Sequence, residues 1–149
     1  FVQLEKMKPF SLFLICVAGV SVFEVDAEVH ADAALLAGQW RIIDDRLDTI
    51  GAMIVWEFTA TEVIVRDGNT GDEVSRSRYT IDPKKSPKWI TVEVDDSPTE
   101  HAGDRRLGIF RIQGGQLQLK QEIIDGAERP DQFDEPFIRF QRLSKNQSP

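Results

Sequence analysis

The fold is decided by two stretches: Gly38-Gln39-Trp40, which opens a series of eight alternating segments, and Phe137-Ile138-Arg139-Phe140-Gln141-Arg142, which closes it. Apolar and polar residues alternate in each segment, as in β-strands that bury one face. The alternation predicts strands at residues 39–45, 52–59, 62–67, 73–81, 89–95, 106–113, 116–124 and 136–143. Short strands at such even spacing predict an all-β chain that closes into a small antiparallel eight-stranded barrel.

The connectors between these segments carry turn residues. Gly114-Gly115 separates two alternating runs, which is typical of a tight β-hairpin because glycine accepts the positive φ angles of such turns. Asp82-Pro83-Lys84-Lys85-Ser86-Pro87-Lys88 predicts a stiff corner with a local positive patch. The patch Lys84, Lys85 and Lys88 indicates either solvated loop side chains or a surface that docks a protein partner.

The N-terminal residues predict export. Lys8 precedes an apolar run at residues 9–23, and Val25-Asp26-Ala27 offers a small-x-small cleavage site. This order is typical of a secretory signal peptide at residues 1–27, with Met7 as its expected start.

Two alternatives to a signal peptide are a membrane-spanning helix and a lipid anchor at Cys16. The run is shorter than the roughly 20 apolar residues that a membrane-spanning helix needs. Cys16 follows the branched Ile15 in the middle of the run, whereas a lipidated cysteine stands at the end of it. We therefore expect an exported protein in the periplasm, the cell envelope or the medium, with no stable membrane span after cleavage.

After this segment we expect one barrel domain at residues 28–143 and a flexible tail at residues 144–149. The single cysteine of the chain, Cys16, lies in the predicted signal peptide. Residues 28–149 therefore have neither a disulfide nor a thiolate metal site. The formal net charge of the chain is −7, which disfavours nucleic acid as a partner because phosphate backbones repel an acidic protein.

The ends of the series predict how the barrel is closed. Residues 32–38 are expected to form one or two helical turns beside the barrel's entrance, with Gly38 in the left-handed closing conformation. Trp40 is placed to cover the bottom of the barrel with its large ring. Arg139 or Arg142 could lie across that ring, because the first and last strands of a closed barrel are neighbours.

The chain resembles a lipocalin-like domain family that is abundant in planctomycete bacteria and belongs with the calycin and lipocalin barrels. The matching stretches include Leu36-Ala37-Gly38-Gln39-Trp40, Trp56-Glu57-Phe58, Tyr79-Thr80-Ile81-Asp82-Pro83-Lys84-Lys85-Ser86-Pro87-Lys88-Trp89-Ile90, Leu107-Gly108-Ile109-Phe110, Arg129-Pro130-Asp131-Gln132-Phe133 and Phe140-Gln141-Arg142-Leu143. The resemblance implies a secreted or cell-envelope barrel of bacteria with no established activity, and the likeness to lipocalins favours a ligand in the barrel. Lys120-Gln121-Glu122 departs from the family pattern, in which this strand is more apolar.

No pattern in the sequence predicts catalysis. His30 lies beside the cleavage region, which leaves His101 in the loop at residues 95–104 as the histidine for a hydrolase-like alternative. That loop contains glycine and proline and gives a nucleophile and its base poor support. Its acidic residues lack the alternate-residue spacing that wraps a calcium ion. We therefore expect no enzyme activity, no metal site and no cofactor.

The interior of the barrel is the candidate binding site. An eight-stranded barrel is either filled by its own side chains or holds one small molecule. Five residues are predicted to line a ligand: Trp56, Phe58, Trp89, Phe110 and Leu119. We expect a non-enzymatic module that binds a small hydrophobic ligand, and the alternative is a packed barrel that acts as an interaction or structural module of the cell envelope.

Overall fold

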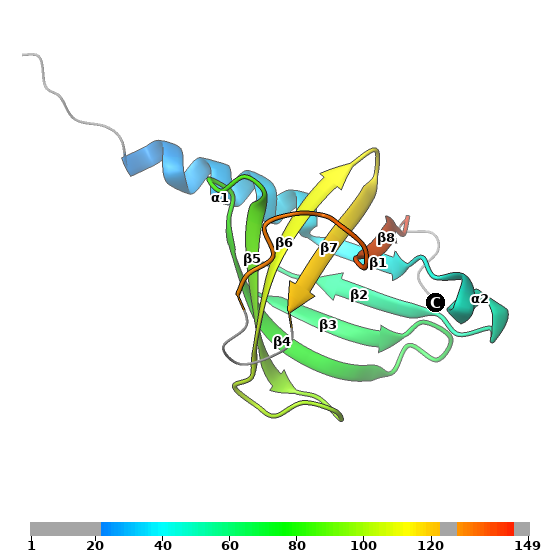
Figure 1. Cartoon of the computed structure of the whole chain (residues 1–149). Helices are drawn as coiled ribbons and strands as arrows, with labels where there is room; N and C mark the ends of the chain where they lie inside the picture. Colours follow the sequence, from blue (N-terminus) through cyan, green and yellow to red (C-terminus); the bar gives the residue numbers. More distant parts are fainter. Residues whose placement is uncertain (1–21, 123–127, 145–149) are drawn as a thin grey trace, which may run out of the picture.

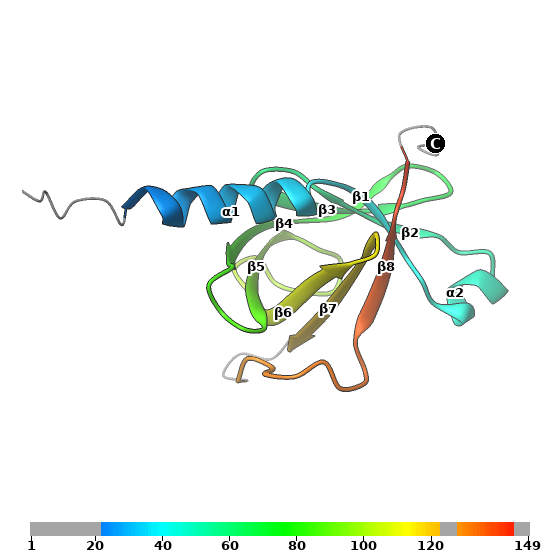
Figure 2. The same ribbon diagram turned by 90° about the horizontal axis from the view of Figure 1, so that it is seen from above.

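The computed structural model describes residues 22–122 and 128–144. Its strands are β1 (Gly38–Ile42), β2 (Ile54–Phe58), β3 (Glu62–Asp67), β4 (Glu73–Asp82), β5 (Lys88–Asp96), β6 (Arg105–Gln113), β7 (Gln116–Glu122) and β8 (Ile138–Arg142). Each strand pairs antiparallel with the next, and β1 also pairs with β8, so the sheet closes on itself (Figure 1, Figure 2). The predicted eight-stranded antiparallel barrel is confirmed.

Two helices accompany the barrel within the described residues: α1 (Val22–Leu36) and α2 (Asp45–Thr49). α1 is longer than the helical turns predicted at residues 32–38, and it runs through the expected cleavage position after Ala27. α2 replaces the end of the strand predicted at residues 39–45. The carboxylate of Asp44 accepts a hydrogen bond from the backbone N–H of Arg46 at 2.9 Å and so caps a helix there.

Some predictions fall outside the described residues. They are the signal peptide up to residue 21, the end of the strand predicted at residues 116–124, and the tail beyond Ser144. Among the residues that the structure does describe, no helix has the length and apolar character needed to cross a membrane.

Alternate side chains of the strands point inward and form one apolar core. The core contains Leu36, Trp40, Trp56, Phe58, Val63, Tyr79, Ile90, Val92, Phe110, Leu117, Leu119 and Phe140. Aromatic rings meet edge to face inside it, with ring centroids 5.2 Å apart for Trp56 and Phe140 and 5.3 Å apart for Phe58 and Tyr79. Burial of these side chains is the main source of the barrel's stability.

The barrel is closed at the end where β1 begins, which we call the helix end. Leu36 of α1 and Trp40 are fully buried there, and the indole N–H of Trp40 donates to the carbonyl of Leu36 at 2.7 Å. The guanidinium of Arg142 lies 4.2 Å from the centre of the Trp40 ring. It also donates hydrogen bonds to the carbonyl oxygens of Leu35 and Ala37, so it ties β8 to the last turn of α1.

Gly38 lies at the helix end beside Arg142, whereas Arg139 lies toward the opposite end of β8. Gly38 has a φ of 122°, and a Cβ at this position would lie 3.0 Å from Nη1 of Arg142. A glycine is therefore needed both by the backbone and by the arginine. Arg139, the other arginine predicted over Trp40, lies over the ring of Phe137 at 4.8 Å and pairs with Glu135.

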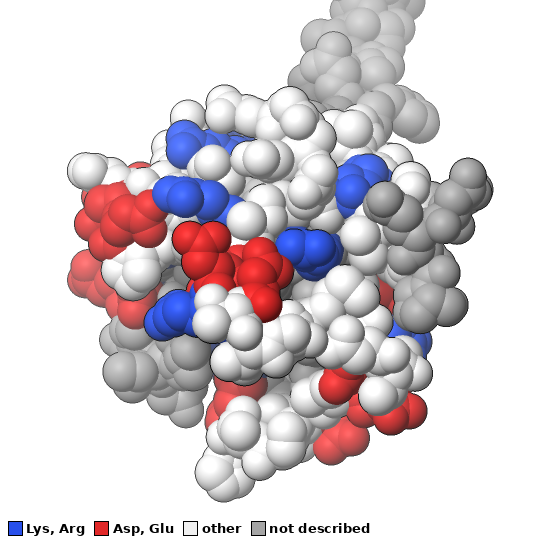
Figure 3. Space-filling model, turned by 90° about the vertical axis from the view of Figure 1, so that its right-hand side faces the viewer, with Lys and Arg blue, Asp and Glu red and all other residues white. Residues whose placement is uncertain are grey.

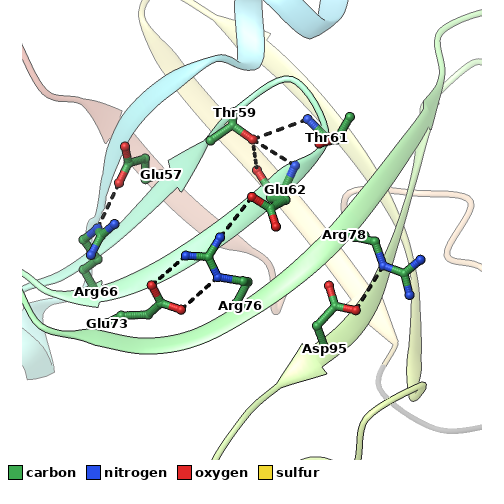
Figure 4. A network of polar contacts seen from close by, with 9 residues as sticks. All are labelled: Glu57, Thr59, Thr61, Glu62, Arg66, Glu73, Arg76, Arg78 and Asp95. Atoms are coloured by element: carbon green, nitrogen blue, oxygen red, sulfur yellow. Dashed lines mark hydrogen bonds and ion pairs between the residues drawn. The ribbon is translucent and has the colours of Figure 1, made fainter.

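The outer surface carries both signs of charge, and Figure 3 shows basic and acidic side chains interspersed on the face that it presents. Arginines of neighbouring strands bridge acidic residues across the outside of β2 to β5 (Figure 4). Arg76 contacts both Glu62 and Glu73, at 3.0 Å and 2.9 Å, and Arg66 contacts Glu57 at 2.9 Å. Each such exposed pair contributes about 0–1 kcal/mol to the free energy of unfolding. The network therefore adds little stability, but it helps to fix the register in which the strands pair.

Residues 128–137 cross the outside of β5, β6 and β7 before β8 begins, and we call them the strap (Figure 2). Arg129 donates to the carbonyl oxygens of Ile90 and Gly108, both at 2.5 Å, and lies 4.6 Å from the centre of the Trp89 ring. Asp134 pairs with Lys120 of β7. The strap is therefore attached to three strands at their outer face.

Candidate functional site

The structure brings four of the five predicted lining residues into the barrel interior. Trp56, Phe58, Phe110 and Leu119 belong to the core, with exposed fractions of 6% or less. Trp89 does not: it is 37% exposed and lies on the outer face between the cations of Lys85 and Arg129. The inward side of β5 is taken by Ile90, Val92 and Val94, and strand alternation therefore turns Trp89 outward.

A cavity of about 520 Å³ opens at the end of the barrel opposite the helix end, and we call it the mouth cavity. Its wall includes inward side chains of five residues: Ile42, Ile54, Trp56, Leu119 and Ile138. α2 with its N-cap, the end of the strap and the start of β8 also line it, through Asp44, Arg46, Leu47, Pro136, Phe137 and Arg139. The cavity has the size of a small-molecule site, and its wall is mostly apolar.

Arg106 lines the mouth cavity and is paired with Glu100. Nε of Arg106 donates to the carboxylate of Glu100 at 2.7 Å, and its Nη2 contacts the other oxygen of the same carboxylate. The side chains of Arg106 and Glu100 are only 16% and 12% exposed. Burial lowers the pKa of Arg106, but a guanidinium stays charged at neutral pH. The pair therefore brings no net charge to the cavity.

A second polar group in this wall has no partner. Nε2 of Gln121 is buried and makes no hydrogen bond with the residues that the structure describes. A buried N–H donor without an acceptor costs about 1–3 kcal/mol, so such atoms are rare in folded proteins. Gln121 is also one of the residues that line the mouth cavity, so this unpaired donor belongs to the wall of the cavity.

Gly108 has no side chain, and this leaves room for the neighbouring strand and for the side chain of Gln121. A Cβ on Gly108 would lie 2.6 Å from the carbonyl oxygen of Lys120 and 2.9 Å from Cγ of Gln121. Any larger residue would push β7 and the Gln121 side chain away from β6. The glycine in the strand Leu107-Gly108-Ile109 therefore keeps the polar wall of the cavity where it is.

The sequence prediction missed Glu100, Arg106 and Gln121. A signal was present for two of them, because Arg106 is four residues from the inward Phe110 and Gln121 is two residues from the inward Leu119. Even spacing along a strand places them on the same face. Glu100 belongs to a loop, where periodicity gives no information about direction.

The loop that holds Glu100 also holds His101. The His101 side chain is 97% exposed, and its Nδ1 lies 3.8 Å from a carboxylate oxygen of Asp104. The hydroxyl of Ser97 interacts with that of Thr99, at 3.4 Å. In residues 22–122 and 128–144, histidine, cysteine and carboxylate side chains form no group of three that could hold a metal ion.

Comparison with known proteins adds no assignment. No protein-family model matches the chain, and no curated protein or solved structure matches it.

Proposed function

We propose that this chain is an exported, non-enzymatic barrel of the lipocalin-like kind that binds a small apolar molecule in the mouth cavity. The observation that carries the proposal is a cavity of about 520 Å³ at one end of a closed barrel, lined by side chains of the core such as Trp56 and Leu119. The opposite end is covered by α1 and Trp40, so a ligand would enter and leave at the mouth.

The polar groups of the wall define the ligand further. Glu100 neutralises Arg106, so a charged ligand would bury an unpaired charge or break that pair, and both are unfavourable. The side-chain amide nitrogen of Gln121 is a donor without a partner among the described residues. The ligand expected here is an uncharged apolar molecule with one hydrogen-bond acceptor, such as a carbonyl oxygen.

Two uncharged fluorescent probes test this proposal. N-phenyl-1-naphthylamine is apolar, and 6-propionyl-2-dimethylaminonaphthalene adds a carbonyl group. Ile54→Trp fills the mouth cavity and is expected to weaken both probes at least tenfold. Val74→Trp is the matched control, because Val74 is 47% exposed on β4 and does not line the cavity. Equal binding by the two variants, both folded in thermal unfolding, would contradict the proposal.

Gln121→Leu separates the polar contact from the apolar wall. The carbonyl probe is expected to lose about fivefold to tenfold in affinity, the value of roughly one hydrogen bond. N-phenyl-1-naphthylamine has no carbonyl and should bind this variant as it binds the wild type. A similar change for both probes would show that Gln121 acts through the shape of the cavity.

A packed barrel that acts through its surface is the second candidate. It is favoured by the filled interior at the helix end, where Trp40, Phe110 and Phe140 are at most 1% exposed. In that case probes would not bind at the mouth, and replacing Lys84, Lys85 and Lys88 would weaken capture of an envelope protein without unfolding the barrel.

Export is proposed from the sequence pattern of residues 1–27. Cleavage after Ala27 would keep the part of α1 that contributes Asp32 and Leu36 to the barrel end. The intact mass of the protein isolated from its host tests this directly: a chain beginning at Glu28 supports export, and an N-terminus upstream of Met7 contradicts the expected start.

A further inference from the structure

A second cavity, of about 460 Å³, lies at the helix end beside the corner that joins β4 to β5. We call it the corner cavity. β5 begins at Lys88, opposite Phe110, so the last three residues of β6 have no partner in β5. The corner, α1 and Phe133 of the strap surround the gap that this leaves. The corner cavity shares no lining residue with the mouth cavity.

The corner cavity is basic although the chain is acidic. Lys85, Lys88 and Arg111 line it, and Asp32 is its one acidic lining residue among the residues described. Nζ of Lys88 contacts both carboxylate oxygens of Asp32, at 2.8 Å and 2.7 Å. The Asp32 side chain is only 8% exposed, so this pair is fixed and neutral. Two positive charges remain in a chain with a net charge of −7.

Neither remaining cation has an acidic partner in the described part of the chain. The guanidinium of Arg111 lies 4.4 Å from the centre of the Phe133 ring, and its Nε donates to Oε1 of Gln118 at 2.5 Å. Nζ of Lys85 lies 4.8 Å from the centre of the Trp89 ring. Aromatic faces and an amide hold both cations in place without neutralising them.

The remaining wall is apolar. Leu35 of α1, Phe110 and Ile112 of β6, and Phe133 line the same cavity. Two unneutralised cations beside an apolar wall are complementary to a negative group attached to an apolar body. The negative charge of the whole molecule repels an extended polyanion, so we expect a small anion as the ligand.

We propose that the corner cavity is a binding site for a small organic anion with an apolar body, held by Lys85 and Arg111. This site is independent of the mouth cavity and of the ligand proposed there. Because Asp32, Leu35 and Phe133 come from α1 and the strap, a bound anion would also fasten both segments to the barrel.

A matched pair of probes tests this site. 1-Anilinonaphthalene-8-sulfonate carries a sulfonate, and N-phenyl-1-naphthylamine is the same molecule without it. The measurements use the Ile54→Trp protein, in which the mouth cavity is filled. The sulfonate probe is expected to bind this protein, and Lys85→Met with Arg111→Met should weaken it at least tenfold. Arg111→Lys keeps the charge and should retain most of the affinity.

Arg66→Met is the control, because Arg66 lines neither cavity and is paired with Glu57. It should leave the affinity for the sulfonate probe unchanged. The proposal is overturned if the double variant, folded in thermal unfolding, binds the sulfonate probe as its parent does. An equal loss in Arg66→Met would overturn it as well. Failure of N-phenyl-1-naphthylamine to bind the wild type would contradict the mouth cavity alone.

Discussion

Arg142 is the residue that joins the two ends of the barrel's sequence. It contacts Trp40 of β1 and the carbonyl oxygens of Leu35 and Ala37 at the end of α1. Arg142→Leu should lower the free energy of unfolding by about 1–3 kcal/mol, because it removes charged hydrogen bonds and the contact with the indole. Urea denaturation measures this loss.

Arg139→Leu is the comparison for Arg142, because it removes an arginine from the same strand. Arg139 pairs with Glu135 four residues away, and both side chains are at least 50% exposed. We expect a loss of about 0–1 kcal/mol. If the two variants lose equal stability, Arg142 has no special role in closing the barrel.

The position of Trp89 on the outer face of β5 could not be predicted from the residues of that strand alone. Lys88-Trp89-Ile90-Thr91-Val92 offers a large aromatic on one face and two aliphatic residues on the other. The structure turns Ile90 and Val92 inward and leaves Trp89 outside, beneath Arg129. Arg129 is 40 positions away in the sequence, and no local pattern indicates that it covers this ring.

At the scale of elements, all eight strands were predicted, because each has a clear alternation and ends at turn residues. Their bounds differ by a few residues where a cap or a corner takes over, as at Asp44 before α2. The strap was not predicted as a covering segment. Its position depends on Arg129 and Asp134, whose partners lie on three different strands.

The strap gives a prediction at this scale. Arg129→Ala removes the hydrogen bonds to Ile90, Gly108 and Thr91 and uncovers one face of Trp89. Quenching of tryptophan fluorescence by acrylamide should increase, since Trp40 and Trp56, the other two tryptophans, are buried. Arg78→Ala, on the outer face of β4, should leave quenching unchanged. Unchanged quenching in Arg129→Ala would contradict the described strap.

Helix α2 gives a prediction about pH. Hydrogen bonds from the side chain and backbone of Arg46 lower the pKa of Asp44 from its usual 3.8 to about 2. A lowered pKa means that the carboxylate stabilises the fold above pH 3.8 and that this contribution disappears as pH falls through 2. The stability difference between wild type and Asp44→Asn should therefore be constant near neutral pH and vanish below pH 2. Chemical denaturation at several pH values measures it, and a constant difference down to that pH would contradict the cap.

At the scale of the whole molecule, the pattern of alternation predicted the closed barrel but neither the mouth cavity nor the corner cavity. The mouth cavity is lined by side chains from several strands, including Ile42, Ile54 and Ile138 of the neighbouring strands β1, β2 and β8. The polar groups there, Arg106 and Gln121, come from strands whose inward face is otherwise apolar. Their role depends on which atoms of other strands stand opposite, and the sequence of one strand does not contain that information.

The central claim is that the mouth cavity takes an uncharged apolar molecule, and native mass spectrometry of protein isolated gently from its host tests it most directly. We expect an added uncharged molecule on the wild type that is lost on denaturation, is kept by Val74→Trp and is absent from Ile54→Trp, whereas an anion in the corner cavity would remain on all three proteins. A wild type without an uncharged molecule, or an equal amount of the same molecule on Ile54→Trp, would contradict the claim.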